Sequence, residues 1–242
     1  MNIGIISQAR MTSTRLPGKV LFPAAQKTML HYHVERLQQS GYQVYIATTT
    51  NLSDLPIVAF CQQQKIPYTC GSEQNVLSRY HACAEQYGLE LVVRVTSDCP
   101  LIDGQLIEEA IQIFLQKPHP YLYISNGIVR TFPRGFDFEV FTAAYLKEAQ
   151  QNATLPMDIE HVTPYIHQNR NGKTIFHHFT QTPDKSRYRI TLDTPEDYSL
   201  LKILIEEHHA HTLNHAQITQ ILDENPQLVQ INAHVEQKKI NE

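Results

Sequence analysis

The sequence predicts an α/β fold of three layers, in which a mainly parallel, twisted sheet lies between two layers of helices. Two observations lead to this prediction. Short apolar runs, such as 3–6 and 91–96, alternate with segments of helical periodicity, such as 29–40 and 104–116, and this alternation is typical of βαβ units. The 242 residues suffice to bury a substantial core, and no internal repeat or low-complexity linker divides them. We therefore predict one domain over residues 1–242.

The predicted elements follow in chain order. In the first half we expect strands at 3–6, 44–49, 65–69 and 91–96. We expect helices at 29–40, 54–64 and 104–116, and a further helix that begins after an N-cap at Ser72. In the second half we expect strands at 121–124, 136–140, 174–180 and 188–192. The helices there are expected at 142–151, around 160–166, from Pro195 through Ile205 and, last, at 214–225.

Three cations, Arg10, Arg15 and Lys19, follow the first predicted strand within ten residues. Guanidinium groups can hold phosphate oxygens bidentately, and an ammonium acts as a mobile point charge. Pro17 and Gly18 predict a turn that aims Lys19 back toward this loop. The residues match neither a P-loop nor a glycine-rich dinucleotide motif. A solvated basic loop is the alternative, but ligands of α/β proteins bind at the carboxyl ends of strands, so we favour a phosphate site.

Two aspartates each follow a predicted strand directly. Asp98 comes after 91–96, and Asp193 comes after 188–192. Carboxylate oxygens are hard ligands that suit magnesium, and the ends of adjacent parallel strands meet at one edge of a sheet. We therefore expect Asp98 and Asp193 to hold one metal ion between them. Asp103, in contrast, is explained as an N-cap of the helix that begins near residue 104.

Three segments carry a resemblance to a known family. Residues 6–21, ISQARMTSTRLPGKVL, resemble the opening of the cytidylyltransferases. They are closest to the spore-coat polysaccharide biosynthesis group, which is related to the 3-deoxy-manno-octulosonate and acylneuraminate cytidylyltransferases. Residues 98–102, DCPLI, and 192–198, LDTPEDY, resemble the two metal-binding segments of that family. Thr12 stands where the group usually has glycine, which changes the shape of the loop but not its charge. The resemblance extends to the polar tail that ends at Glu242.

The resemblance implies a fold of the nucleotide-diphospho-sugar transferase type (GT-A or Rossmann-like) and a Mg²⁺-dependent transfer of CMP from CTP to a sugar or sugar acid. Pyrophosphate would leave, and the product would serve the synthesis of a surface polysaccharide. The implied catalytic residues are Arg10, Arg15, Lys19, Asp98 and Asp193. The implied nucleotide contacts are Ala9, Arg10, Ser13, Arg15, Lys19, Ser72 and Arg79. The implied acceptor contacts, within an acceptor-side excursion over 118–180, are Arg134, Asp137, Glu139 and His161.

Composition narrows the classes of function. A net charge of −4 argues against bulk binding to nucleic acid or to anionic membranes. Four cysteines without CxxC spacing suggest neither a zinc site nor a disulfide framework. Because the first strand begins two residues after Met1 and no apolar run approaches about 18 residues, we expect a cytoplasmic protein without signal peptide or membrane span.

Three points stay open at this stage. A related nucleotidyltransferase that uses another nucleoside triphosphate has the same needs for cations and carboxylates, since no residue of the sequence identifies the base. A non-catalytic nucleotide-binding subunit is a second alternative, although both aspartates and all three cations are present. Assembly as a homodimer is a third open point.

Overall fold

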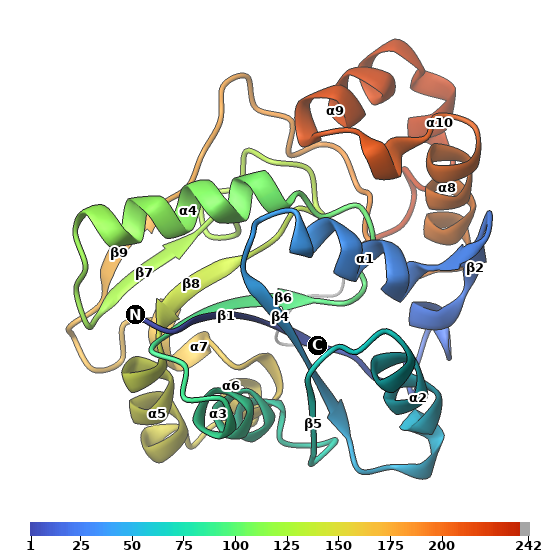
Figure 1. The fold of residues 1–242 in the computed structure, drawn as a ribbon. Coiled ribbons are helices and arrows are strands. Elements are labelled where there is room, and N and C mark those ends of the chain that lie inside the picture. The colour runs from blue at the N-terminus through green and yellow to red at the C-terminus, as the bar shows by residue number, and fades with distance from the viewer. Residues whose placement is uncertain (238–242) are drawn as a thin grey trace.

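The computed structural model describes residues 1–237, so the tail 238–242, assigned above to the end of the family, lies outside the described residues. Its main sheet has the strand order β5-β4-β1-β6-β8-β7-β9 (Figure 1). The strands are β1 Ile3–Gln8, β4 Gln43–Thr49, β5 Tyr68–Gly71, β6 Leu91–Thr96, β7 Leu122–Ser125, β8 Glu139–Thr142 and β9 Ile175–His178. A small ribbon of β2 Pro23–Ala24 and β3 Lys27–Thr28 lies apart from it.

The sheet is mainly parallel, as predicted. β1 pairs in parallel with both β4 and β6, β4 pairs so with β5, and β7 pairs so with β9. Only the pairings of β8, with β6 and with β7, are antiparallel. The polar carboxyl ends of β1 and β6 therefore lie side by side at one edge, because Gln8 is in register with Thr96.

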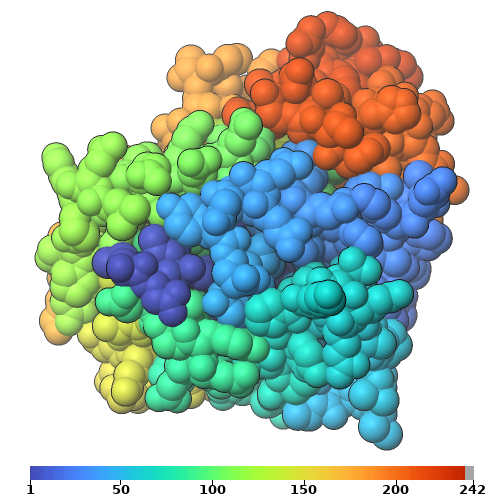
Figure 2. All heavy atoms as spheres, viewed as in Figure 1, coloured from blue at the N-terminus to red at the C-terminus, as the bar shows by residue number. Residues whose placement is uncertain are grey.

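Helices cover both faces of the sheet, which confirms the three-layer prediction (Figure 1). One face carries α1 Met29–Gln38, α2 Leu55–Gln63 and α4 Gly104–Gln116, and the other carries α3 Val76–Gln86, α5 Ala143–Asn152, α6 Pro156–His161 and α7 Pro164–His167. Three further helices, α8 Pro195–Glu206, α9 His215–Glu224 and α10 Pro226–Gln230, pack beside α1. Short 3₁₀ turns are η1 Lys19–Leu21, η2 Leu52–Asp54 and η3 Ala210–Thr212. Figure 2 shows the C-terminal segment seated against the N-terminal half of the chain.

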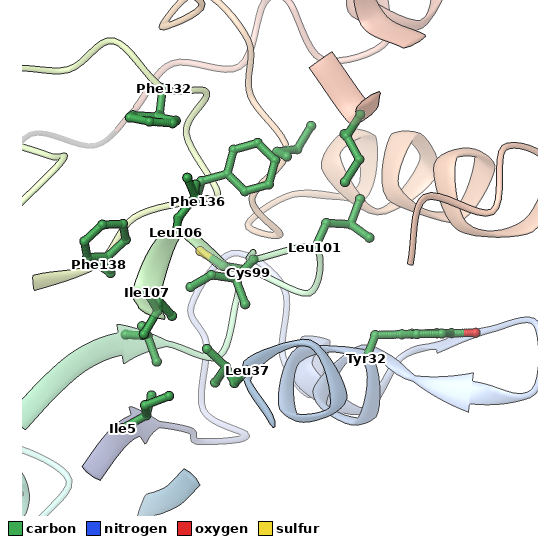
Figure 3. Packing of buried hydrophobic residues seen from close by; sticks show 14 of the residues in the cluster. Ile5, Tyr32, Leu37, Cys99, Leu101, Leu106, Ile107, Phe132, Phe136 and Phe138 are labelled. Carbon is green, nitrogen blue, oxygen red and sulfur yellow. The ribbon is translucent and has the colours of Figure 1, made fainter. Parts of the chain in front are cut away.

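The largest apolar cluster fills the space between the sheet and the layer of α1 and α4. Ile5 of β1, Leu37 of α1 and Ile107 of α4 meet there, and each is completely buried (Figure 3). Full burial of one such side chain stabilises the fold by about 1.5–3 kcal/mol. The turn after β6 contributes Cys99 and Leu101 to the same cluster, so the turn is anchored to the core.

Four predicted elements are wrong in detail. The strand predicted at 136–140 begins only at Glu139, because the side chain of Asn126 takes the backbone hydrogen bonds of Phe136 and Phe138. Residues 188–192 form no strand of the sheet but an extended segment with a single bridge, between Arg134 and Arg189. The helix expected around 160–166 is two short helices, because Val162 adopts φ 72° and Pro164 can only begin a new helix. The helix at 214–225 is not the last, since α10 follows it.

Smaller shifts concern two turns. The N-cap of α3 is Asn75, whose side chain accepts a hydrogen bond from the backbone N–H of Ser78. Ser72 instead accepts from the N–H of Asn75, one turn too early to cap the helix. The strand predicted at 65–69 begins at Tyr68, because Lys65 has φ 56° and belongs to the preceding turn.

Candidate active site

Asp98 and Asp193 meet at the sheet edge, although not by the predicted route. The backbone N–H of Leu192 donates to the carbonyl oxygen of Asp98 at 2.7 Å, and the Thr191 hydroxyl donates to the same oxygen at 3.1 Å. The extended segment 188–192 thus crosses the end of β6 rather than adding a parallel strand beside it. Hydrogen bonds to a turn, not to a strand, bring the second aspartate to the first.

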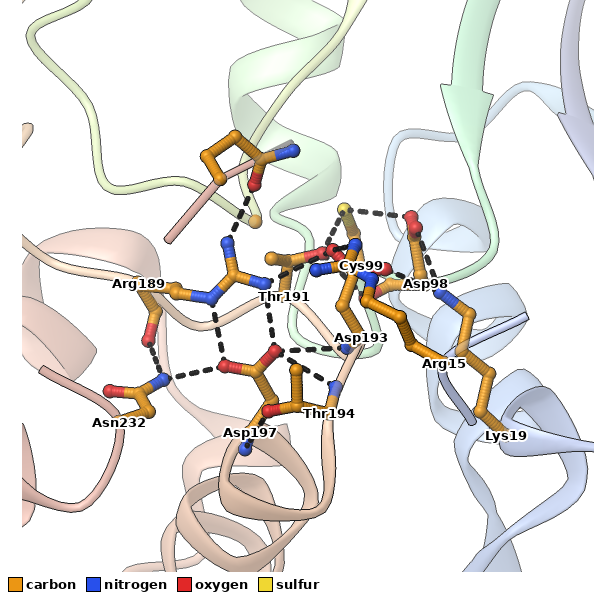
Figure 4. Close-up of polar contacts among 12 residues, drawn as sticks. Arg15, Lys19, Asp98, Cys99, Arg189, Thr191, Asp193, Thr194, Asp197 and Asn232 are labelled. Atoms are coloured by element: carbon orange, nitrogen blue, oxygen red, sulfur yellow. Dashed lines mark hydrogen bonds and ion pairs between the residues drawn. The ribbon is translucent and has the colours of Figure 1, made fainter. Parts of the chain in front are cut away.

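Lys19 lies between the two carboxylates (Figure 4). Its Nζ is 2.7 Å from Oδ1 of Asp193 and 3.2 Å from Oδ2 of Asp98. Gly18, with φ 73°, makes the turn that a glycine permits, and Lys19 then opens η1. The ammonium therefore points at the carboxylates instead of back at its own loop. Arg15 pairs with the other oxygen of Asp193, with Nη2 at 2.9 Å from Oδ2.

These contacts change the ionisation of the groups. Burial opposes the charge of Lys19, yet Asp98 and Asp193 outweigh it and raise the pKa of Lys19. Burial likewise opposes the ionisation of Asp98, but the attraction of Lys19 and a hydrogen bond from Thr96 lower its pKa to about 2. At neutral pH the centre is therefore a set of fixed charges, a form suited to holding a polyanion and its counter-ion.

A cavity of about 520 Å³ opens beside the cationic loop. Its lining includes the predicted nucleotide contacts Ala9, Arg10, Ser13, Arg15, Lys19 and Arg79, together with Asp98 and Asp193. Ser72, predicted as a further contact, does not belong to the lining of either cavity. Two hydrogen bonds fix the cationic loop to the rest of the chain. The Thr12 hydroxyl donates to Glu73, and the N–H of Met11 donates to Asp54 Oδ1 at 2.7 Å.

Arg79 is the unusual member of this lining. Its side chain comes from α3 and is almost fully buried, yet Nε and Nη1 have no hydrogen-bond partner among the described residues. Burial lowers the pKa of Arg79. A buried guanidinium with unused donors is costly unless a ligand engages it.

A second cavity, of about 530 Å³, adjoins the first and shares Gln8, Arg15, Asp98 and Asp193 with it. The four predicted acceptor contacts Arg134, Asp137, Glu139 and His161 all line it. Glu139 is fully engaged, since one oxygen pairs with Arg94 and the other accepts from Tyr123 and Thr163. Asp137 pairs with Arg130.

Arg134 differs from the other arginines of this cavity, because it forms no ion pair within residues 1–237. Burial and the neighbouring charge of Arg130 lower its pKa. The acceptor-side cavity thus offers one guanidinium whose charge is not neutralised by a carboxylate in contact with it.

A nucleotidyl transfer needs two adjoining binding sites that share a cluster of charges, and the two cavities provide this arrangement. Comparisons with known proteins agree with a nucleotidyltransferase. A family model described as "Cytidylyltransferase" matches residues 3–240. The chain belongs to the cytidylyltransferase family.

Individual relatives support this assignment. The spore coat polysaccharide biosynthesis protein SpsF of Bacillus subtilis is 35% identical over 217 residues, which cover 85% of this chain and 87% of that protein. The solved structure of a cytidylyltransferase from Leptospira borgpetersenii has a TM-score of 0.90 and 34% identity, covering 95% of this chain and 97% of that one. CMP:2-keto-3-deoxy-manno-octonic acid synthetase, solved with CTP, shares the fold at a TM-score of 0.62 and 17% identity over 86% of this chain and 100% of that one.

In this cytidylyltransferase, several residues that line or support the site were not predicted from the sequence. Gln8, Arg94, Arg130, Glu160 and Gln237 line the acceptor-side cavity. Arg189 supports the centre by bonding Asp193 at 3.0 Å and Asp197 at 2.7 Å (Figure 4). A usable signal was present for the arginines, since Arg94 interrupts the apolar strand LVVRVT and Arg189 interrupts YRITL.

The donor set fits the magnesium ion that the resemblance implies. Oxygens of Asp98 and Asp193 both reach one ammonium, so the two carboxylates converge on a single cation. Within residues 1–237 no three His, Cys, Asp or Glu side chains converge for a metal. A magnesium ion bound here would need triphosphate oxygens and water to complete its coordination, as it commonly does. In the same part of the chain, no helix combines the length and the hydropathy to cross a membrane.

Proposed function

We propose that this cytidylyltransferase transfers CMP from CTP to a sugar acid in the cytoplasm, releases pyrophosphate, and so activates the sugar for a surface polysaccharide. The observation that carries the proposal is the pair of cavities that meet at Asp98 and Asp193, the two carboxylates that Lys19 contacts. One is lined by the cations of the loop, and the other contains Arg134. The names of relatives support the two substrates: SpsF acts in spore coat polysaccharide biosynthesis, and the octonic acid synthetase was solved with CTP.

The chemistry follows from the positions of the charges. A hydroxyl oxygen of the acceptor attacks the α-phosphorus of CTP and forms a new P–O bond, while its proton is released to solvent. The bond from the α-phosphorus to the oxygen that bridges to the β-phosphate breaks, so that pyrophosphate leaves. Negative charge develops on that leaving group, and Arg10, Arg15 and Lys19 are placed to stabilise it. The acceptor supplies the nucleophile, so the protein needs none. Magnesium, when bound by Asp98 and Asp193, would supply further stabilisation of the triphosphate charge.

Binding requires an exchange of ionic partners. In the described structure Lys19 and Arg15 neutralise Asp98 and Asp193. An incoming triphosphate competes for the same cations, and a divalent ion bound with it competes for the same carboxylates. Each charge therefore keeps an opposite partner throughout, which avoids the cost of an unpaired buried charge.

The acceptor is oriented by charge on its own side. Arg134 is placed to pair with a carboxylate of the sugar acid, because a guanidinium matches that group bidentately. Glu139 does not have a free oxygen for the acceptor, and we assign it the role of holding Arg94 at the cavity wall. His161 and Glu160 lie where both cavities meet, between the two substrates.

A pyrophosphate-release assay tests the proposal. The purified chain is offered each of the four ribonucleoside triphosphates with a panel of acidic and neutral sugars and Mg²⁺. We expect release with CTP and an acidic sugar, and a sharp loss in Asp98→Asn and in Asp193→Asn. The double variant should be scarcely worse than either single one, because both residues act on one centre. Equal turnover with UTP, or CTP binding without turnover of any acceptor, would contradict the proposal.

A further inference from the structure

A chain of buried polar side chains lies directly behind the turn that carries Asp98. The hydroxyl of Ser7, in β1, is 2.8 Å from Nε2 of His33 in α1 and 2.7 Å from the hydroxyl of Ser97. On the other side of the ring, Nδ1 of His33 is 2.8 Å from the carbonyl oxygen of Cys99. All four residues are buried, and neither His33 nor Ser7 lines either of the two cavities described above.

The carbonyl at one end fixes the direction of every bond in this chain. The Cys99 oxygen can only accept, so Nδ1 of His33 carries the hydrogen and donates it. The ring is neutral at physiological pH, because burial lowers the pKa of His33 to about 4. Nε2 therefore accepts from the Ser7 hydroxyl, and the Ser7 oxygen accepts from the Ser97 hydroxyl. Every donor and acceptor of the ring is used, as a buried polar network requires.

These bonds clamp the turn on both sides of Asp98. Ser97 is held through Ser7, and Cys99 is held through His33, so the residue between them has little freedom. The carbonyl oxygen of Asp98 in turn accepts from the N–H of Leu192, next to Asp193. A shift of the turn would therefore displace both carboxylates of the centre.

We propose that His33 is a positioning residue, which fixes the turn that presents Asp98 to the magnesium–triphosphate. The inference rests on the proposed function. His33 touches neither substrate and acts through Ser7, Ser97 and the Cys99 carbonyl. Residues that orient a metal-binding group in this indirect way typically change metal affinity or activity by about 10–100-fold when replaced.

Two substitutions at one position test the proposal. His33→Leu introduces an apolar side chain of similar size and removes both hydrogen bonds. His33→Asn places an amide N–H where Nδ1 lies, so it can still donate to the Cys99 carbonyl. Ser40→Ala is the matched control, because it removes a buried hydroxyl that bonds Leu37 at the end of the same helix, away from the site.

Four quantities are measured for each variant: kcat, KM for CTP, the Mg²⁺-dependent affinity for CTP by calorimetry, and hydrogen exchange of the amides of 97–99. We expect His33→Leu to lose about 10–100-fold in kcat and to bind CTP more weakly only when Mg²⁺ is present. Its 97–99 amides should exchange faster. His33→Asn should retain clearly more turnover than His33→Leu, and the Ser40→Ala control should match the parent.

Several results would overturn the proposal. One is a folded His33→Leu with the kcat, Mg²⁺-dependent affinity and exchange of the parent, and another is His33→Asn as impaired as His33→Leu. If His33→Leu does not fold, Ser7→Ala breaks the same chain with little loss of volume, and unchanged turnover and exchange in it would refute the proposal. A parent that turns over no triphosphate contradicts the proposed function instead, while calorimetry and hydrogen exchange still decide the role of His33.

Discussion

The ammonium of Lys19 contacts two carboxylates that differ in their other partners, and this arrangement couples stability to binding. Within residues 1–237 the carboxylate of Asp98 otherwise accepts only from Thr96 and Cys99, its neighbours in the turn, whereas the carboxylate of Asp193 keeps Arg15 and Arg189. Lys19 thus has two roles at the residue scale. It neutralises the two carboxylates, and it is available to the triphosphate.

Replacing Lys19 by alanine should therefore lower stability as well as CTP affinity. We expect a loss of about 1–3 kcal/mol in the free energy of unfolding, because Asp98 is left without its cation. Added Mg²⁺ should raise the unfolding temperature of Lys19→Ala more than that of the parent, since the ion can bind between the carboxylates. Lys185→Ala, which removes a 2.7 Å pair with Asp223, is the control. An equal effect of Mg²⁺ on all three proteins would contradict this.

His33 makes a separate prediction about pH. Its pKa is about 4 in the folded chain, against about 6.5 for an unfolded histidine. A depressed pKa contributes stability that is complete above pH 6.5 and is lost as the pH falls through 4. The contribution amounts to roughly 3 kcal/mol. Denaturant unfolding between pH 7 and 4 should show a shallower loss for His33→Leu than for the parent. His234→Gln, at an exposed position, should follow the parent; a parallel decline in all three would refute the prediction.

At the scale of elements, local patterns predicted most of the fold, and long-range contacts decided the rest. The helix 104–116 and its Asp103 cap were found because periodicity and capping are local. Residues 188–192 alternate like a strand, but their hydrogen bonds go to Arg134 and to the turn at Asp98. Only the folded chain shows that these bonds go to Arg134 and to the Asp98 turn and not to a strand of the main sheet.

The same reasoning explains the candidate site. The loop cations and the two aspartates could be predicted, since each follows an apolar run directly in the sequence. The bonds of Lys19 to both aspartates, and of His33 to Cys99, span 66 to 174 positions and leave no local pattern. The sequence therefore predicted which groups take part but not how they neutralise or hold one another.

Gly135 sets the position of the extended segment, and this gives an element-scale prediction. It has φ 117°, and a Cβ there would lie 2.7 Å from the carbonyl oxygen of Ile190. Gly135→Ala should push segment 188–192, and with it Asp193, away from Asp98. We expect a loss of about 2–4 kcal/mol in stability and a clear drop in kcat. Gly172→Ala shares a positive φ but has nothing within 4 Å, so it isolates the backbone strain. Equal effects of the two substitutions would argue against the steric role.

At the scale of the whole molecule, a chain of net charge −4 concentrates its arginines around two adjoining cavities. Most of these arginines form an ion pair with a carboxylate of the chain. Arg94 pairs with Glu139, and Arg130 pairs with Asp137. Arg79 in the first cavity and Arg134 in the second are not held in this way. Within residues 1–237 each cavity thus keeps one arginine without an ion pair, and we propose that each of these arginines serves one substrate.

That division predicts a crossed pattern of kinetic effects. Arg79→Met should weaken CTP binding roughly 10–150-fold and leave the acceptor KM nearly unchanged, while Arg134→Met should do the reverse. Arg79→Met should also unfold no more readily than the parent, because the apolar side chain replaces a buried charge whose donors are partly unused. Initial rates with each substrate varied in turn, together with denaturant unfolding, measure all three quantities. If either variant raised both KM values alike, or if Arg79→Met were strongly destabilised, Arg79 would be a structural residue and the two cavities would not divide the substrates between them.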